Sequence, residues 1–217
     1  YEDAESGWVY NRFRFYDPAA GVYGAQDPLG VAAKVATAQG YVNHAVALVD
    51  PLGLAAHPKV PFTSRTFEAT DGVNKVNIEV TPYSPRVAGG GGHHVPMKSV
   101  MGPDGVNMDL KNYAPSIRPS ELGKLGELNG PLNGLDGNKI HTRITTEQGS
   151  VFRNAYKQGV MENASWETVR KYDVMAHVNV GVPQEFAESV VDAGIDYYKA
   201  NGFSSPVGLP WPNRQPW

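Results

Sequence analysis

The sequence contains no cysteine among its 217 residues. This absence excludes disulfide bonds, thiolate metal sites and a cysteine nucleophile, and with them the zinc deaminases that use cysteine ligands. A bound metal ion would need His, Asp, Glu or Asn ligands, which favours Mg²⁺, Zn²⁺, Mn²⁺ or Ni²⁺. The sequence also lacks an apolar run long enough to cross a bilayer, so we expect no stable membrane association.

An excess of basic charge is lacking as well, because the formal net charge is −3. Residues 1–54 hold three basic and six acidic side chains, and the rest of the chain holds 16 of each. Nucleic-acid-binding proteins are usually basic, so this neutrality counts against extensive contact with a nucleic-acid backbone. It does not exclude an enzyme that binds a few phosphates locally. The 24 glycines and 17 prolines indicate many turns and short elements.

Residues 1–54 are rich in aromatic residues and turn signals. Alternating apolar and polar residues over 9–15 predict a half-buried strand. The Asp-Pro start and Gly end of 17–21 predict a turn, with a return strand beginning at Val22. The phrase Asp27-Pro28-Leu29-Gly30 recurs as Asp50-Pro51-Leu52-Gly53, followed by Leu54. This repeat, with an acid at its head, is more specific than either copy alone.

The aromatic-rich composition ends after Leu54. Two prolines, which disfavour both helix and strand, then predict a linker over residues 55–61. Residues 75–81 alternate as a strand does. Helix signals follow in four places: a helical turn near 119–125 capped by Ser120, a helix from Thr145 to Gly159, one capped by Asn163 or Ser165 that reaches Val178, and one over 183–200. The order of these elements predicts an α+β domain.

The most informative stretch is Gly89–Lys98, in which four glycines precede His93 and His94. Glycines allow a sharp turn and a close approach to a ligand. Neighbouring side chains on a strand point to opposite sides, so one imidazole could bind a metal ion while the other accepts a proton. The alternative is a glycine-rich surface loop with two solvated histidines. His177, within a predicted helix, is more typical of a packed histidine than of a metal ligand.

The phrases of residues 16–30, 41–46 and 49–54 resemble the end of an Rhs-repeat core. In that family a long β-sheet cocoon closes with such a segment, and a variable toxin follows. The resemblance implies that Asp27 and Asp50 cleave the chain between Leu54 and Ala55. Two adjacent carboxylates do not both ionise easily, so one could act as an acid while the other activates water. The alternative is a pair of Asp-Pro turns that cap strands.

The phrase Gly92–Ser99 resembles the Gly-His-His toxin nucleases, which belong to the HNH or His-Me finger group related to endonuclease VII. Residues 141–159 and 208–211 share the likeness. The resemblance implies an α+β fold with a ββα-metal (His-Me finger) nuclease-like toxin domain and C-terminal helices, preceded by a short β-rich Rhs terminus.

In that family pattern His94 is the general base, and His93 and His141 are metal ligands. Lys98 would contact phosphate or the leaving oxygen, and Arg143 would contact a substrate phosphate. For both of these side chains, a solvated surface position is the alternative. The ligand set is incomplete, because no matching asparagine is clear.

These inferences predict an antibacterial effector toxin, of the type VI secretion kind, with a metal-dependent endonuclease that hydrolyses DNA. The predicted domains are residues 1–54, a linker and toxin start over 55–75, and the nuclease over 76–217. The expected partners are DNA, a cognate immunity protein and the Rhs cocoon of the parent chain. The protein would be made in the bacterial cytoplasm and delivered into a target cell's cytoplasm. The alternatives are RNA as substrate, a non-catalytic domain that binds a partner, and a toxin of another enzyme class.

Overall fold

The computed structural model describes residues 2–11, 14–26, 41, 48–49, 57–58, 60–83, 92–101, 108–161 and 164–206. The chain forms two compact units, Tyr1–Pro61 and Phe62–Trp217. The division falls within the stretch 55–75, where the sequence predicts a linker and the start of the second domain. Asp27, Asp50 and the predicted cleavage site Leu54–Ala55 lie outside the described residues.

The first unit contains a three-stranded antiparallel sheet of β1 (Val9–Asn11), β2 (Arg14–Asp17) and β3 (Val22–Tyr23). The prediction of one strand over 9–15 is wrong, because β1 pairs with β2 as a hairpin. Alternation continues through a reversal of this kind, since two residues suffice to join antiparallel strands. The predicted turn at 17–21 is confirmed, with Asp17 Oδ1 accepting from two backbone N–H groups. A short pair, β4 (Leu48–Val49) with β5 (His57–Pro58), completes the unit's described strands.

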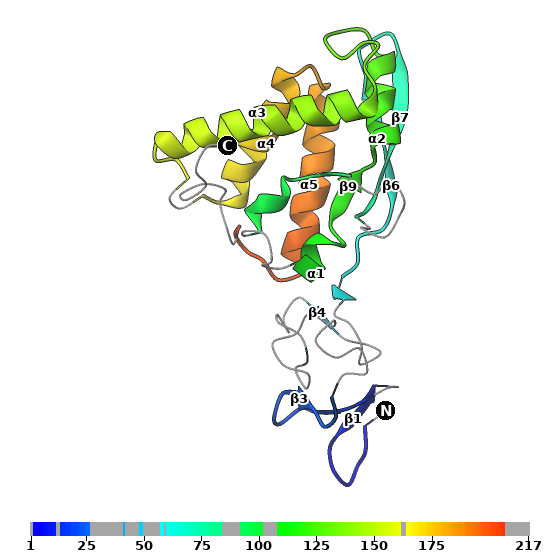
Figure 1. Ribbon diagram of the computed structural model, residues 1–217, viewed down its shortest axis with the longest axis vertical. Coiled ribbons are helices and arrows are strands. Elements are labelled where there is room, and N and C mark those ends of the chain that lie inside the picture. Colours follow the sequence, from blue (N-terminus) through cyan, green and yellow to red (C-terminus); the bar gives the residue numbers. More distant parts are fainter. Residues whose placement is uncertain are drawn as a thin grey trace. The chain divides into compact units, whose positions relative to one another are not determined.

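The second unit is built on a four-stranded antiparallel sheet in the order β6-β7-β9-β8 (Figure 1). The strands are β6 (Arg65–Thr70), β7 (Lys75–Pro82), β8 (His93–His94) and β9 (Pro115–Ile117). The predicted strand over 75–81 is therefore confirmed. Burial alternates along β7, since its valine and isoleucine side chains face the core and the intervening polar ones face solvent.

Most of the helices follow the last strand of the sheet in the chain, and the α+β prediction is confirmed. The helices are α1 (Met108–Lys111), α2 (Pro119–Leu122), α3 (Gly137–Lys157), α4 (Trp166–Asn179) and α5 (Gln184–Ala200), with the 3-10 turns η2 (Lys98–Val100) and η3 (Gly123–Glu127). The predictions of α4, with Ser165 as its cap, and of α5 are confirmed. None of the described helices is long and apolar enough to span a membrane.

Two predicted helix starts are wrong. The structure begins α3 at Gly137 rather than at Thr145, because the side chain of Asp136 accepts a hydrogen bond from Lys139 N and caps the helix. It begins α2 at Pro119 with Arg118 at the cap position, whereas Ser120 lies inside the helix. Proline suits the first helical turn because its missing N–H would have no partner there.

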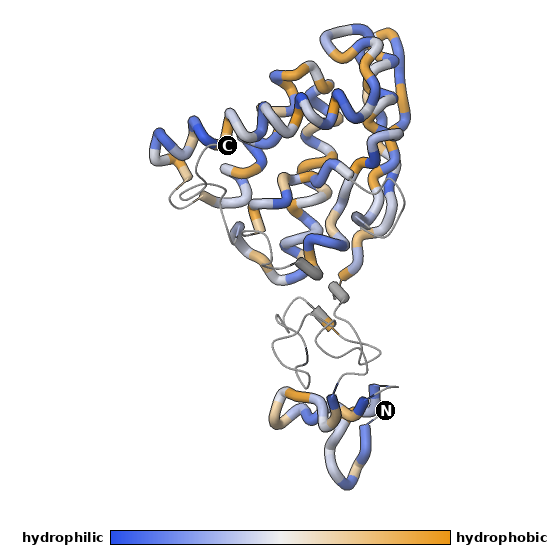
Figure 2. The backbone as a smooth tube through the Cα atoms, in the orientation of Figure 1, coloured by the Kyte–Doolittle hydropathy of each residue, from blue (hydrophilic) through white to orange (hydrophobic). Residues whose placement is uncertain are grey.

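Helices pack on the sheet and on one another. Helix α5 contacts β6 and β9, while α4 contacts both α3 and α5 (Figure 1). Colour alternates between hydrophilic and hydrophobic along α3 in Figure 2, and its buried face carries Ile140, Ile144, Val151 and Phe152. Burial of such an amphipathic face supplies most of a helix's stability.

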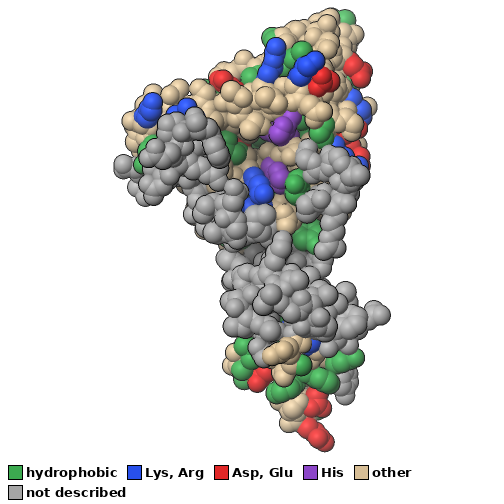
Figure 3. All heavy atoms as spheres, in the orientation of Figure 1, with side chains coloured by type: hydrophobic (Ala, Val, Ile, Leu, Met, Phe, Trp, Pro, Cys, Tyr) green, Lys and Arg blue, Asp and Glu red, His purple; other side chains and the backbone are tan. Residues whose placement is uncertain are grey.

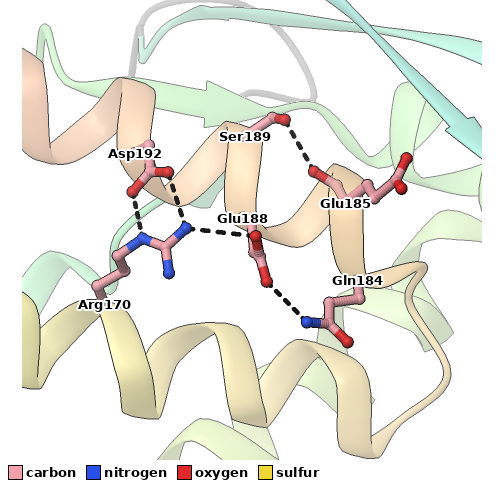
Figure 4. A network of polar contacts seen from close by, with 6 residues as sticks. All are labelled: Arg170, Gln184, Glu185, Glu188, Ser189 and Asp192. Carbon is pink, nitrogen blue, oxygen red and sulfur yellow. Dashed lines mark hydrogen bonds and ion pairs between the residues drawn. The ribbon is translucent and has the colours of Figure 1, made fainter.

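Polar side chains also link α4 to α5 at the surface (Figure 4). The guanidinium of Arg170 donates to both carboxylate oxygens of Asp192, at 2.6 and 3.0 Å, and to Glu188 at 3.4 Å. Gln184 in turn donates to Glu188. Arg170 therefore joins α4 to α5 through ion pairs at the surface.

Candidate active site

Strand β8 consists of the two adjacent histidines and lies at one edge of the sheet. His93 pairs with Ile117 and His94 with Ser116 of β9. Gly92 precedes them where a Cβ atom would come within 2.8 Å of the Ser116 hydroxyl, so a side chain there would crowd β9. The register places the two imidazoles against different neighbours, as expected for adjacent strand residues.

One ring nitrogen of His94 forms a hydrogen bond, and the other has no partner among the described residues. Its Nε2 is buried and has no hydrogen-bond partner among the described residues, while the backbone of Lys111 accepts a hydrogen bond from the ring. That bond must therefore involve Nδ1–H. The ring lies 4.3 Å from the ring of Tyr83, centroid to centroid. Burial, followed by the charge of Lys98, lowers the pKa of His94 to about 4, so the ring is neutral near pH 7.

His93 belongs to a buried chain of hydrogen bonds. Its Nε2 lies 2.9 Å from Nε2 of His177 on α4. The other nitrogen of His177, Nδ1, lies 2.7 Å from the carbonyl oxygen of Asp173 and 3.2 Å from its Oδ1. Gln148 Nε2 on α3 donates to Asp173 Oδ1 at 2.8 Å, and Met97 N donates to Oδ2 at 2.7 Å. Burial, with the neighbouring histidines, holds the pKa of His93 well below its usual range.

The two predicted metal ligands lie close together but do not complete a metal site. The ring centroids of His93 and His141 are 5.5 Å apart, and burial lowers the pKa of His141. Within the described ranges, no group of three or more His, Asp or Glu side chains could hold a metal ion. His93 Nε2 is engaged with His177 at hydrogen-bond distance. In this arrangement the described residues therefore supply fewer than three ligands for a metal ion.

Of the remaining predicted site residues, the structure brings one to the histidines. Lys98, in η2, lies close enough for its charge to act on His94. Arg143 lies two positions after His141 on α3, where side chains do not share a face, and its Nη1 donates to Pro131 O at 3.1 Å. The structure therefore does not place Arg143 with the cluster.

Sequence reasoning missed several polar residues of this cluster. His177 was expected to be a packed histidine, and it is buried, but it also contacts His93. Asp173 precedes it by four positions, a spacing that places both side chains on one helix face and could have indicated a polar pair. No sequence signal connects Gln148 or Lys111 to the histidines, because these residues meet them only through tertiary packing.

Histidine side chains reach the surface beside a lysine or arginine side chain on the face shown in Figure 3. The ring of His94 is neutral, and its Nε2 has no partner among the described residues. With the charge of Lys98 nearby, such a ring is suited to accepting a proton from water beside an anionic group. Phosphate esters are substrates that match this combination of base and positive charge.

Comparison with known proteins finds similarity over about a quarter of the chain. The chain is 52% identical over 56 residues (26% of its length) to probable deoxyribonuclease RhsA of Dickeya dadantii. It is 55% identical over 53 residues (24% of its length) to probable deoxyribonuclease RhsB of the same bacterium. It is 44% identical over 54 residues (25%) to toxin protein Tse5 of Pseudomonas aeruginosa. Each match spans only 4% of the relative's length. No protein-family model matches the chain, and no solved structure is significantly similar to it.

The matches agree in part with the sequence analysis. They show that the chain contains a segment shared with Rhs proteins, as the repeated Asp-Pro phrases predict. Most of the chain lies outside each match, so the matches assign no role to the histidine cluster as a whole.

Proposed function

We propose that the chain is the C-terminal toxin region of an Rhs protein and that its second unit is an endonuclease acting on DNA. The observation that carries this proposal is the buried Nε2 of His94, which has no hydrogen-bond partner among the described residues and belongs to a ring that is neutral near pH 7. An unprotonated nitrogen with no competing partner is what a general base requires. Two relatives named as probable deoxyribonucleases support DNA as the substrate.

In the proposed reaction, His94 Nε2 takes a proton from water while the water oxygen attacks phosphorus. The bond from phosphorus to the leaving sugar oxygen breaks, and the ammonium of Lys98 gives that oxygen a proton. The hydrogen bond from His94 Nδ1 to the Lys111 backbone keeps the ring in the tautomer that this step needs. The charge of Lys98 also stabilises the anionic transition state.

A divalent metal ion, Mg²⁺, Zn²⁺, Mn²⁺ or Ni²⁺, stays part of the proposal as a requirement to be tested. His93, through the ring nitrogen that His177 does not engage, and His141 are its proposed ligands, and a ββα-metal core is the proposed type of fold. Since the described side chains provide no group of three ligands, the steps above assign nothing to a metal ion.

The test is cleavage of plasmid DNA by the full chain with Mg²⁺ or Mn²⁺, with and without EDTA. His94→Ala should lower the rate by about 100-fold or more, because a general base contributes at least that much. Lys171→Ala, an exposed change on α4, should leave the rate unchanged. Equal residual cleavage by wild type and His94→Ala would indicate contamination and overturn the proposal. Cleavage that survives EDTA would remove the metal requirement, and cleavage of RNA alone would change the substrate.

For the parent protein, we propose an effector made in a bacterium, released from its Rhs cocoon, delivered into a target cell's cytoplasm and neutralised by an immunity protein. Toxin protein Tse5 among the relatives supports a toxin role. Release would occur by aspartyl autoproteolysis after Leu54, with Asp27 and Asp50 as the acid–base pair. The intact mass of a longer Rhs chain tests this step. A product beginning at Ala55, lost in Asp50→Asn, is expected, and a chain left uncleaved under native conditions would overturn it.

The immunity partner has a separate test. Co-expression of the chain with its neighbouring open reading frames should identify one small protein that co-purifies with it and rescues growth. Failure of every neighbour to do either would count against a dedicated immunity protein.

A further inference from the structure

We propose that His177 and Asp173 on α4 are positioning residues that hold His93 and, through β8, set the place of His94. The hydrogen-bonded arrangement is independent of the nuclease proposal, whereas its catalytic consequence rests on that proposal.

The first argument is burial with nearly complete pairing. Gln148, Asp173, His177 and His93 are each exposed by 2% or less, although all four side chains are polar. A buried polar group is costly unless it is hydrogen-bonded, and these four are joined in one chain of contacts. A satisfied buried network of this kind fixes side-chain geometry, because any change leaves a buried group without a partner.

The second argument is the order of protons along the chain. His177 Nδ1 faces two oxygen atoms of Asp173, which only accept, so Nδ1 carries a proton. The proposed order gives His177 no second proton, so that its Nε2 accepts from His93 Nε2–H across the 2.9 Å contact. His93 is thereby held with its proton on Nε2. That nitrogen is committed to His177 and does not ligate a metal ion in this arrangement.

The third argument is the position of the two hydrogen bonds that join α4 to the segment around His94. Helix α4 bonds the side chain of His93 through His177 and the backbone N–H of Met97 through Asp173 Oδ2. These two points lie immediately before and shortly after His94 in the sequence, so α4 fixes both ends of the segment that carries the base. Displacement of a reacting group by about 1 Å costs on the order of 100-fold in rate, so this anchoring matters for catalysis.

The direct test is ¹⁵N NMR of the imidazole rings in the full chain near neutral pH. The expected result is a proton on Nε2 of His93 and on Nδ1 of His177. A His93 ring with its proton on Nδ1 would overturn the proposed order of hydrogen bonds. This readout needs no enzymatic activity.

The catalytic consequence is tested with two variants of one position. His177→Gln keeps a carbonyl that can accept from His93, whereas His177→Leu removes every acceptor. We expect kcat for plasmid cleavage to fall by about 100-fold in His177→Leu with KM within about twofold, and the Gln variant to retain most of the activity. Asn179→Ala, which breaks a surface bond from the same helix to Glu147, is the matched control and should leave kcat unchanged.

Equal losses of kcat in the Leu and Gln variants, in proportion to their folded fractions, would overturn the positioning role. If His177→Leu does not fold, Asp173→Asn is used in its place. The asparagine keeps one side-chain oxygen as an acceptor, but its NH₂ group cannot accept the hydrogen bonds that both carboxylate oxygens accept in the wild type, among them the one from Met97 N–H. Correct tautomers in a wild-type chain that cleaves no nucleic acid would overturn the proposed function while leaving the hydrogen-bonded arrangement intact.

Discussion

Gly194 of α5 lies directly against the backbone carbonyl of Val95, the residue that follows His94. A Cβ atom at Gly194 would overlap that carbonyl and the ring of Pro96. The absence of a side chain therefore lets the helix backbone support the turn that leaves β8. Together with the anchors on α4, this contact confines the segment that carries the proposed base.

Gly194→Ala should destabilise the protein by about 1–3 kcal/mol, because overpacking forces backbone or side chains to shift. The matched control is Gly149→Ala on α3, where a Cβ meets nothing within 4 Å. That substitution should stabilise the helix by about 0.5–1 kcal/mol. Urea unfolding measures both free energies. An unchanged free energy of unfolding in Gly194→Ala would contradict this prediction and show that the turn after His94 moves at little cost.

Stability should fall as the pH falls from about 6.5 to about 4. Histidine in the unfolded chain takes up a proton near pH 6.5, whereas burial keeps folded His94 neutral down to about 4 and lowers the pKa of His93 well below its usual range. The unfolded state then binds more protons, which costs up to about 1.4 kcal/mol per pH unit for each histidine. Urea unfolding at a series of pH values should show this loss.

The carboxylates act in a different pH range, which separates their contribution. Asp71 and Asp136, whose pKa values are lowered by hydrogen bonds to backbone N–H groups, lose their stabilising effect only below about pH 4. His94→Gln should make the slope between pH 6.5 and 4 shallower. An unchanged slope in this variant would mean that His94 is protonated in the folded protein.

Lys98→Met should reduce DNA cleavage by about 100-fold, since a cation that stabilises transition-state charge contributes on this scale. It should also raise the pKa of His94, because the charge of Lys98 is one of its lowering causes. The acidic limb of the pH–rate profile would therefore move to higher pH. Lys171→Met, on the exposed face of α4, is the control for loss of a lysine. A lower rate with an unshifted limb would place Lys98 away from His94.

The N-terminus of α3, which carries His141, depends on one cap. Asp136→Ala removes the acceptor for Lys139 N and should cost about 1 kcal/mol, while Asp136→Asn keeps an acceptor and should cost less. Chemical denaturation compares the two variants with wild type. Equal losses would assign the effect to charge at the helix terminus rather than to the hydrogen bond.

Arg170 links α4 and α5 with good geometry but at the surface (Figure 4), where water and salt screen ion pairs. Arg170→Met should therefore lower the free energy of unfolding by about 1 kcal/mol or less. The difference should shrink at high salt, as measured by unfolding at two ionic strengths. A larger loss that does not depend on salt would assign the effect to packing of the aliphatic stem.

Local signals in the sequence predicted those elements whose stability is local. Ser165 caps α4 as predicted, and the alternating residues 75–81 lie in β7. Both predictions were possible because helix caps and the alternation of a strand depend on residues close together in the sequence. The hairpin of β1 and β2 was missed, since alternation does not mark where a chain reverses. The early start of α3 at Gly137 was missed because Asp136 was not recognised as its cap.

The sequence by itself determined the chemical repertoire: no thiol, two adjacent histidines after four glycines, and a repeated Asp-Pro-Leu-Gly phrase. Only the tertiary structure decided which nitrogen of each histidine is engaged, because His177, Asp173 and Gln148 come from helices far along the chain. Burial made that selection decisive, since a polar atom away from water must take whichever partner the fold supplies. His94 Nε2 was left without one among the described residues, and that one bare atom is the basis of the proposed chemistry.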